Sequence, residues 1–255
     1  MIEPSRLLPA GNANHYAEPT TLVTAMNDRT NSDDTHDPAA AAARMVQTQL
    51  HRRGIVDQRV LEAMTSVPRH HFVPEVDIEA AYSDRALPTA EGQTISQPYI
   101  VAKMTEMLQP QPDSRVLEVG TGSGYQTAVL ALLAKEIVTI ERFAGLAERA
   151  REAIASLGLA GKITFVVGDG TLGHPPKAPY DGILVTAAAP TVPAALRDQL
   201  AEGGRLVLPL GEREGQHLYV IRREGEHFTQ TQDLSCRFVP LVGEQGWDHD
   251  HKDEQ

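Results

Sequence analysis

Val116-Leu-Glu-Val-Gly-Thr-Gly-Ser-Gly-Tyr125 is the stretch of sequence that decides the fold. In it a short apolar run ends at three alternate glycines, Gly120, Gly122 and Gly124, and a helical pattern follows. Glycine has no Cβ, so it permits positive φ and lets a ligand approach the backbone. In open α/β sheets such a loop lies at the carboxyl ends of the strands, where ligands bind. The stretch therefore predicts a strand, a ligand-binding loop and a helix in succession.

Short apolar runs alternate with helical stretches from about Tyr99 onward. This alternation is typical of a parallel sheet covered by helices on both faces. After Gly211 the helical pattern stops, which favours a final strand pair. We therefore predict an α/β fold with a doubly wound, mostly parallel seven-stranded sheet, an antiparallel terminal strand and N-terminal helices. The predicted strands are Arg115–Val119, Ile137–Ile140, Ile163–Val167, Gly182–Val185, Arg205–Leu210, Leu218–Arg222 and Arg237–Val242, and the predicted helices are Gln126–Ala134, Gly145–Leu157 and Pro193–Ala201.

Two further helices are predicted ahead of the glycine loop. Ala39–Arg53 is rich in alanine and stops at Gly54, a suitable helix end. Asp57 can cap a second helix that places Val60, Leu61 and Met64 on one face before Pro68 ends it. The following residues, 69–98, are predicted to be mostly loop, and ordered loops of this length are often functional.

The charge is unevenly distributed along the 255 residues, which carry a net charge of −11. Residues 1–38 contribute −4 and residues 248–255 contribute −3, which leaves −4 for residues 39–247. The first segment lacks a hydrophobic period and is broken by prolines, so it is predicted to be disordered. The predicted organisation is a disordered extension (1–38), a helical and loop region on the substrate side (39–98), a cofactor-binding domain (99–247) and an acidic tail (248–255).

Composition excludes several classes of protein. The acidic balance argues against a nucleic-acid surface, which needs clustered Lys and Arg. A single cysteine, Cys236, excludes an internal disulfide and a cysteine-based zinc cluster and fits a reducing compartment. No apolar run approaches the length of a membrane span, and no secretory signal is recognisable. We expect a cytoplasmic protein without a metal, and a monomer, since no long exposed apolar helix suggests an assembly face.

Acidic residues follow the next two predicted strands. Glu141 ends the second strand, 21 positions after Gly120, where a carboxylate can accept both hydroxyls of a ribose. Asp169 ends the third strand, followed by Gly170, and can accept from an adenine amino group. A dinucleotide fingerprint would place its third glycine at 125, where Tyr125 stands instead. The pattern therefore favours a nucleoside-type cofactor other than NAD.

Glu118-x-Gly-x-Gly-x-Gly124 resembles motif I of the methyltransferases that use S-adenosylmethionine. A longer set of segments, spread over roughly residues 44–247, resembles the protein-L-isoaspartate O-methyltransferases. The most specific is Gly92-Gln-Thr-Ile-Ser-Gln-Pro-Tyr-Ile-Val-Ala102, since methyltransferases at large do not share it. Thr89-Ala90 departs from the Ile-Gly that this family usually has there. The other matching segments are Arg53–Ile55, Val67–Pro74, Ala81–Asp84, Pro179–Gly182, Ala187–Pro190, Gly203–Pro209 and Arg237–Leu241.

The resemblance implies an enzyme with a Rossmann-like fold that methylates the free α-carboxylate of isoaspartyl residues in damaged proteins and peptides, which starts their repair through a succinimide. Ser96 matches the active-site serine of the family. We expect it to orient the substrate carboxylate, because a carboxylate is already ionised at neutral pH and needs no general base. His70 and His71 are interpreted as structural or surface residues. The implied substrate-binding residues are Thr94, Ile95, Ser96 and Gln97, and the implied S-adenosylmethionine-binding residues are Glu118, Gly120, Thr121, Gly122, Gly124, Tyr125, Glu141, Asp169 and Gly170.

Two other functions remain open from the sequence. The first is a methyltransferase for a small molecule or an RNA, although the absence of a basic cluster disfavours RNA. The second is a non-catalytic module that keeps the fold to bind cofactor or damaged chains. Retention of the glycines together with Glu141, Asp169 and Ser96 favours an active enzyme.

Overall fold

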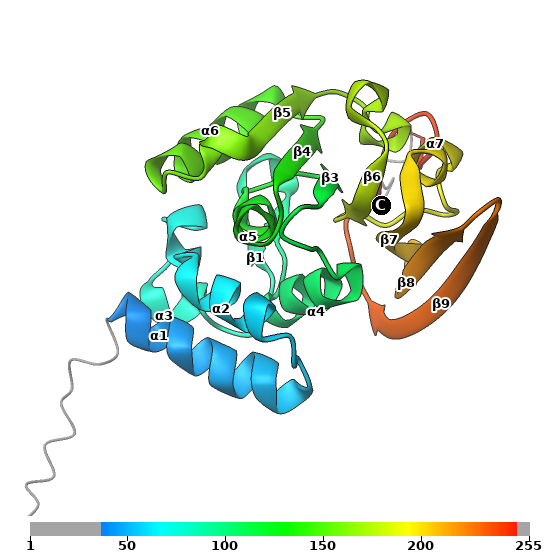
Figure 1. Ribbon diagram of the computed structural model, residues 1–255. Coiled ribbons are helices and arrows are strands. Elements are labelled where there is room, and N and C mark those ends of the chain that lie inside the picture. The colour runs from blue at the N-terminus through cyan, green and yellow to red at the C-terminus, as the bar shows by residue number, and fades with distance from the viewer. Residues whose placement is uncertain (1–36, 249–255) are drawn as a thin grey trace, which may run out of the picture. The chain divides into compact units, whose positions relative to one another are not determined.

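The computed structural model describes residues 37–248 (Figure 1). The predictions of a disordered extension and an acidic tail therefore fall almost entirely outside the described residues. Of the extension, Asp37 and Pro38 are described, and both take part in the first helix, because the Asp37 carboxylate accepts a hydrogen bond from Ala39 N at 2.9 Å. No helix in residues 37–248 is long and apolar enough to cross a membrane.

A seven-stranded sheet has the order β5-β4-β3-β6-β7-β8-β9. Only β8 runs against the others, since β3 to β7 pair in parallel and β8 pairs antiparallel with both β7 and β9. The chain turns back at β3, so the crevice between β3 and the neighbouring β6 is a topological switch point, where ligands bind in such folds. The strands are β3 (Arg115–Val119), β4 (Glu136–Glu141), β5 (Ile163–Val167), β6 (Tyr180–Val185), β7 (Leu200–Glu212), β8 (Gly215–Glu224) and β9 (His227–Cys236).

The predicted fold class is confirmed, and six of the seven predicted strands overlap observed ones. The prediction of a strand at Arg237–Val242 is wrong. The last strand is His227–Cys236, a mostly exposed edge strand that follows β8 through a tight hairpin. Its residues are mostly polar and face solvent, so it lacks the short apolar run by which the other strands are recognisable. Residues 237–242 instead leave the sheet and form isolated bridges, one of them between Ala188 and Pro240.

Alternate residues of each strand face opposite layers. Val116 and Leu184 point to a layer formed by α4 (Pro98–Leu108) and α5 (Tyr125–Leu133). Leu117 and Ile183 point to the opposite face, where α7 (Ala194–Asp198) packs. The third helix on the first face is α6 (Ala144–Ser156), against β4 and β5.

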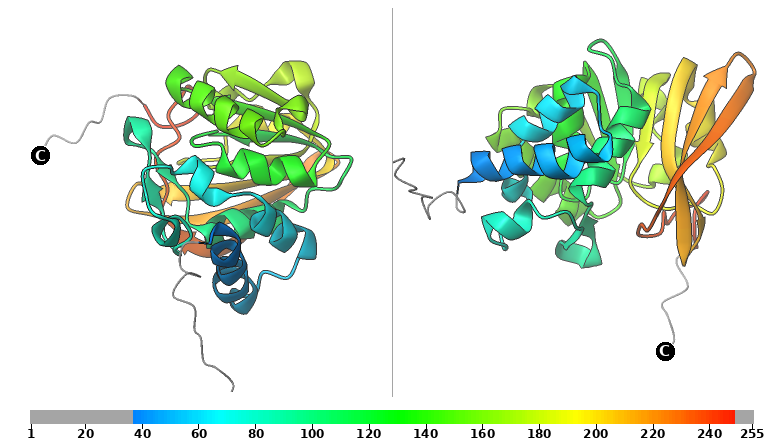
Figure 2. Two further views of the ribbon diagram at one scale, coloured as in Figure 1. Left: turned by 90° about the vertical axis from the view of Figure 1, so that its left-hand side faces the viewer. Right: turned by 90° about the horizontal axis from the view of Figure 1, so that it is seen from below.

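The N-terminal helices pack against α5 rather than forming a separate core. The predicted helix 39–53 is α1 (Pro38–Met45) continued by a π-helical turn (Val46–Leu50) and a 3₁₀ turn (His51–Arg53), and Gly54 ends it in a left-handed conformation. The second, α2 (Gln58–Ser66), is capped by Asp57 and buries Val60, Leu61 and Met64 as predicted. These helices share one hydrophobic cluster with α5. Figure 2 shows them on the opposite side of the molecule from the β8–β9 hairpin.

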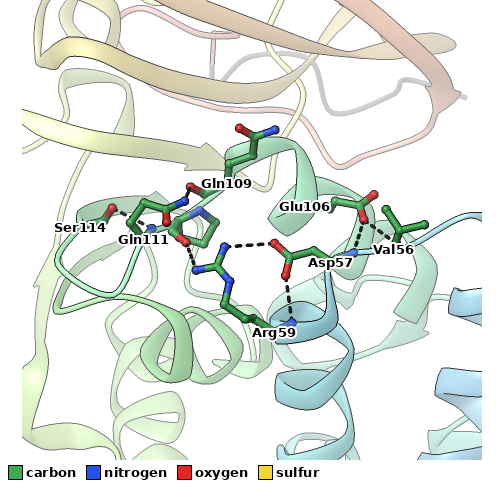
Figure 3. A network of polar contacts seen from close by, with 8 residues as sticks. Val56, Asp57, Arg59, Glu106, Gln109, Gln111 and Ser114 are labelled. Atoms are coloured by element: carbon green, nitrogen blue, oxygen red, sulfur yellow. Dashed lines mark hydrogen bonds and ion pairs between the residues drawn. The ribbon is translucent and has the colours of Figure 1, made fainter.

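A polar network joins the start of α2 to the end of α4 (Figure 3). The Glu106 carboxylate accepts hydrogen bonds from the backbone N–H groups of Val56 and Asp57, at 2.7 and 2.9 Å. Arg59 donates to the carbonyl of Pro110 at 2.9 Å and pairs with Asp57. The network fixes the N-terminal helices on the helix that leads out of the Ser96 segment.

The segment 69–98 contains more regular structure than predicted. It has a 3₁₀ turn (Arg69–Phe72), the short helix α3 (Ile78–Ala81) and a small antiparallel pair in which Leu87 lies opposite Ile95. The helix α4 that follows was not predicted from the sequence. Pro98 marks its first turn, where proline is tolerated because the missing N–H has no intrahelical partner. The short strands are β1 (Leu87–Pro88) and β2 (Thr94–Ile95).

Candidate active site

A pocket opens at the carboxyl ends of β3, β4 and β6. Its walls combine the glycine loop, the end of β4 and the Gln93–Gln97 segment. Residues 236–242, which begin with the last residue of β9, form a further wall. The structure thus brings both groups of predicted residues, those for cofactor and those for substrate, to one pocket. The predicted residues that line it are Thr94, Ile95, Ser96, Gln97, Gly120, Thr121, Gly122, Tyr125, Glu141 and Gly170.

The glycine loop depends on positive φ at all three glycines, with values of 95° at Gly120, 54° at Gly122 and 91° at Gly124. A Cβ on Gly120 would lie 2.3 Å from Oγ1 of Thr186, so this position also requires glycine for space. Gly122 is different, because a Cβ there would meet no atom within 4 Å. The loop therefore presents open backbone at Gly122 toward the pocket, as a cradle for a ligand does.

Glu141 is 6 % exposed and lines the pocket at the end of β4. Its Oε2 accepts a hydrogen bond from Gly122 N at 2.9 Å, and its Oε1 accepts from Phe143 N at 3.0 Å. An ionised carboxylate has about four acceptor positions. The two backbone bonds therefore orient the side chain and leave acceptor positions for hydroxyl groups of a ligand.

Glu118 lies behind the glycine loop and does not line the pocket. Its Oε2 accepts hydrogen bonds from the hydroxyls of Thr127 and Thr139, the latter at 2.6 Å, while its Oε1 has no partner among the described residues. Thr139 is in turn 2.7 Å from the hydroxyl of Thr121, which does line the pocket. Glu118 is therefore connected to the glycine loop through Thr139 and Thr121. Strand alternation explains this, since Glu118 points toward α5 while Leu117 and its counterparts face the other layer.

Burial raises the pKa of Glu118 to about 7, and the charge of Glu141 adds to this, although the bonds from Thr127 and Thr139 lower it. Between about pH 4.5 and 7 the folded protein therefore keeps a proton on Glu118 that the unfolded chain, with the ordinary carboxyl pKa, has already released. Stability from this group is present below that interval and is lost as the pH rises through it. We expect Glu118→Gln, which has no such proton, to gain stability relative to the unmodified protein between pH 5 and 8, by roughly 3 kcal/mol at most.

Urea unfolding of both proteins at pH 5 and pH 8 tests this expectation, because every other titrating group is shared and cancels in the difference. A difference in unfolding free energy that stays constant between the two pH values would show that Glu118 does not titrate in this range.

Asp169 follows β5 and is also absent from the pocket lining, whereas its neighbour Gly170 is part of it. Its Oδ1 accepts from the backbone and hydroxyl of Thr171 at 2.8 and 2.7 Å, and its Oδ2 accepts from Glu244 N at 2.8 Å. Burial raises the pKa of Asp169, but these hydrogen bonds together outweigh it and lower the pKa below its usual value. A Cβ on Gly243 would lie 2.1 Å from Oδ1. Asp169 thus holds residues 243–244, which follow the 236–242 wall, against the turn after β5.

Ser96 is half-buried and lines the pocket, and its hydroxyl has no hydrogen-bond partner among residues 37–248. Thr94 is exposed and Ile95 is buried, as the pairing of β2 with β1 requires. The side chain of Gln97 donates to the carbonyl of Asp84 at 3.0 Å. The hydroxyl of Ser96 is therefore available to a ligand, while Gln97 is already engaged in holding the loop.

The sequence did not identify several residues that line the pocket. Thr186 follows β6, and its hydroxyl donates to the carbonyl of Gly120 at 2.7 Å. Arg142 and Phe143 follow Glu141 directly, and Arg237 belongs to the 236–242 wall. For Thr186, Arg142 and Phe143, the place directly after β6 and β4 is the signal that indicates them, since ligands bind at the carboxyl ends of parallel strands. Residues 236–242 were not predicted to line the pocket, because that stretch was predicted to be a strand, although Arg237–Leu241 is one of the segments that resemble the family.

The described residues contain no cluster of His, Cys, Asp or Glu that could hold a metal ion. His70 lies outside the pocket lining, with Nδ1 3.0 Å from the hydroxyl of Tyr82. Cys236 lines the pocket, and burial raises the pKa of its thiol to about 11, so it is a thiol at neutral pH. The pocket therefore combines the backbone of the glycine loop, a carboxylate, hydroxyls and apolar side chains with two arginines, Arg142 and Arg237.

The chain is similar to known proteins over most of its length. Residues 41–246 match the family described as protein-L-isoaspartate(D-aspartate) O-methyltransferase. A protein-L-isoaspartate O-methyltransferase of Methanoculleus marisnigri is 56 % identical over 204 residues, which are 80 % of this chain and 92 % of the relative. One of Trichlorobacter lovleyi is 53 % identical over 208 residues, 81 % of this chain and 95 % of the relative.

Solved structures agree with these relatives. A protein-L-isoaspartate O-methyltransferase structure superposes with a TM-score of 0.73 and 28 % identity, over 80 % of this chain and 67 % of the other. A Plasmodium falciparum structure assigned to the same enzyme type, in complex with S-adenosyl-L-homocysteine, has a TM-score of 0.69 and 26 % identity, over 79 % of this chain and 98 % of the other. With the family match and relatives above 50 % identity, the chain belongs to the protein-L-isoaspartate(D-aspartate) O-methyltransferase family.

Proposed function

We propose that this protein transfers a methyl group from S-adenosylmethionine to the free α-carboxylate of L-isoaspartyl residues in damaged proteins and peptides. The methyl ester carries methoxide, a better leaving group than the oxygen of a carboxylate, so the following backbone nitrogen attacks the ester carbonyl and displaces methanol. The succinimide that forms is opened by water, in part to normal aspartate. One observation carries the proposal: Ser96 and the glycine loop with Glu141 line the same pocket. A donor on the loop and an acceptor beside Ser96 would therefore meet.

The cofactor half of the pocket suits a nucleoside with a charged tail. The open backbone at Gly122 can receive the ligand, and Glu141 has acceptor positions for the two hydroxyls of a ribose. The P. falciparum relative holds S-adenosyl-L-homocysteine, which has the same nucleoside. We assign direct contacts to Gly120, Thr121, Gly122, Tyr125, Glu141 and Gly170. We assign supporting roles to Glu118, Gly124 and Asp169, because these three do not line the pocket.

The substrate half needs to orient a group that is already reactive. S-adenosylmethionine supplies an electrophilic methyl group on a sulfonium. A carboxylate with a pKa near 4 is ionised at neutral pH, so no protein base has to remove a proton. The hydroxyl of Ser96 can donate a hydrogen bond to one carboxylate oxygen and leave the other free to approach the methyl carbon in line. Such positioning converts a bimolecular step into a local one.

The surroundings of Ser96 favour a substrate that is recognised through its main chain. Thr94, Ile95 and Gln97 line the pocket on either side of Ser96, in a short strand and the residues after it, where main-chain groups are close to a bound peptide. A damaged aspartate can occur in many sequence contexts, so recognition of backbone rather than neighbouring side chains fits this substrate. We assign residues 39–98 to the substrate side and residues 99–247 to cofactor binding.

We further propose that the protein acts in the cytoplasm as a monomer and does not bind nucleic acid. The single cysteine fits a reducing compartment. The net charge of −4 over residues 39–247 gives no broad basic surface for phosphates.

Two peptides that are identical except for aspartate or isoaspartate at one position test the proposed function. With labelled S-adenosylmethionine, we expect a base-labile methyl ester on the isoaspartyl peptide alone, because only there does the free α-carboxylate take the side position. Equal labelling of both peptides would indicate a methyltransferase of different specificity. Binding of the cofactor without any labelling would indicate a non-catalytic module.

A further inference from the structure

Arg69 is completely buried, with 0 % exposure, in the 3₁₀ turn that follows α2. Its Nε donates to the carbonyl of Ala81 at 2.8 Å and its Nη2 donates to the carbonyl of Ser96 at 2.8 Å. Its Nη1 has no hydrogen-bond partner among the described residues, and no carboxylate there forms an ion pair with it. A buried charge without a paired carboxylate is costly, so the fold retains Arg69 against a desolvation penalty.

Arg69 also contacts the beginning of the cofactor-side helix. Its guanidinium carbon lies 4.9 Å from the centroid of the Tyr125 ring, a distance at which a cation and an aromatic face attract each other. Tyr125 is the first residue of α5, directly after the glycine loop, and it lines the pocket. The ring is held from another side by Phe72, with centroids 5.6 Å apart at an edge-on angle. One buried guanidinium therefore contacts both halves of the site.

The charge of Arg69 is offset by its surroundings rather than by one partner. Burial lowers its pKa, while the neighbouring Tyr125, Tyr82 and Asp84 raise it. The guanidinium of arginine is so strongly basic that it stays charged in proteins. The cation can therefore polarise the Ser96 carbonyl and hold it more firmly than a neutral donor would.

The Ser96 segment is held from its exposed side as well. Gln97 donates to the carbonyl of Asp84, the Asp84 carboxylate pairs with Arg53 at 2.5 Å, and Arg53 lies 3.6 Å from the centroid of the Tyr99 ring. These side chains are partly exposed, so solvent weakens the ion pair. Arg69 is the buried counterpart, and its bond goes to the main chain of Ser96 itself.

We propose that Arg69 is a positioning residue that fixes the main chain of Ser96 relative to Tyr125 and so sets the approach of the substrate carboxylate to the methyl group. The inference rests on the proposed function, because it takes Ser96 as the residue that orients the carboxylate. A guanidinium suits the task because its rigid planar fork can donate to two carbonyls while its face lies against an aromatic ring. Lysine, with a single ammonium on a flexible stem, cannot do both.

Arg69→Lys tests the proposal because it keeps the charge and loses the fork. We expect kcat for methylation of an isoaspartyl peptide to fall about tenfold or more, since small misplacements of reacting groups cost up to about 100-fold. We expect the Kd of S-adenosyl-L-homocysteine, measured by calorimetry, to change less than threefold. The rate is expressed per binding-competent molecule, counted by the stoichiometry of that titration, so partial misfolding does not enter it.

Arg223→Lys is the matched control. Arg223 also bridges two carbonyls, donating to Leu200 at 2.7 Å and to Gly225 at 3.2 Å, but it lies on β8 outside the pocket lining. The kcat of the Arg223→Lys variant should stay within twofold of that of the unmodified enzyme. An equally small change for Arg69→Lys would overturn the proposal, and so would a failure of that variant to bind S-adenosyl-L-homocysteine. Absence of ester formation by the unmodified enzyme would instead refute the proposed function.

Discussion

Glu141→Gln should weaken the binding of S-adenosyl-L-homocysteine by about 100-fold. The carboxylate of Glu141 lines the pocket and has free acceptor positions, so we expect it to accept both hydroxyls of the ribose. Hydrogen bonds to a charged acceptor contribute about 1.5–3 kcal/mol each, and each factor of ten in affinity corresponds to about 1.4 kcal/mol. Glutamine has one acceptor oxygen and no charge, so roughly two factors of ten are lost. Calorimetric titration of both proteins measures the change.

A second contribution to the same loss comes from the glycine loop. Oε2 of Glu141 accepts from Gly122 N, and Oε1 accepts from Phe143 N. In glutamine one of these oxygens becomes an NH₂ group, which cannot accept. One backbone N–H therefore loses its partner, and the loop or the turn after β4 becomes less well held.

Glu136→Gln is the control, because Glu136 is the first residue of the strand that Glu141 ends. Glu136 lies at the amino ends of the strands, away from the pocket at their carboxyl ends. Its carboxylate pairs with Lys177 at 2.6 Å and Arg115 at 2.9 Å. Hydrogen bonds from Lys177 and Arg115 lower its pKa. We expect the Kd of S-adenosyl-L-homocysteine to be unchanged in this variant. Equal effects of the two substitutions, or less than a threefold effect of Glu141→Gln, would contradict the ribose assignment.

The strands that the sequence predicted well are those whose burial leaves a pattern. Arg115–Val119 is almost entirely buried and Ile163–Val167 is a half-buried edge strand, and both have the predicted bounds because each is an apolar run between helices. The edge strand His227–Cys236 faces solvent and leaves no such pattern. The helix Pro98–Leu108 was missed because its first proline resembles the end of a loop, although proline is equally suited to the first turn of a helix.

In the site, the sequence predicted which segments come together better than which side chains line the pocket. The carboxyl ends of neighbouring parallel strands lie at the same edge of the sheet, so the sequence could predict that Gly122 and Glu141 come together. It could not predict that Glu118 and Asp169 would be absent from the pocket lining, because that depends on partners distant in sequence. Arg69 belongs to the family-like segment Val67–Pro74, but nothing in the sequence indicated its burial, since an arginine is ordinarily expected on the surface.

Ser96→Ala should lower kcat for an isoaspartyl peptide by about 100-fold and leave the Kd of S-adenosyl-L-homocysteine within twofold. Ser96 lines the pocket with a hydroxyl that has no partner among the described residues, so its removal breaks no hydrogen bond seen there. The substrate carboxylate would lose the donor that fixes its rotation. Loss of one well-placed donor, or a misplacement of about 1 Å, typically costs about 100-fold in rate. Steady-state kinetics with labelled S-adenosylmethionine, combined with calorimetry, separates the two quantities.

Ser156→Ala is the control, because this exposed serine at the end of α6 lies outside the pocket lining and its hydroxyl donates to the carbonyl of Ala153. Its kcat and Kd should match those of the unmodified enzyme. A rise in KM of the peptide at unchanged kcat would mean that Ser96 contributes to binding alone, because an interaction equal in ground and transition states changes KM only. A large loss of cofactor affinity would place Ser96 in the other half of the pocket. The predicted fall in kcat requires that the hydrogen bond from Ser96 matter most as the carboxylate approaches the methyl group in line, which is the role that its place beside the glycine loop allows.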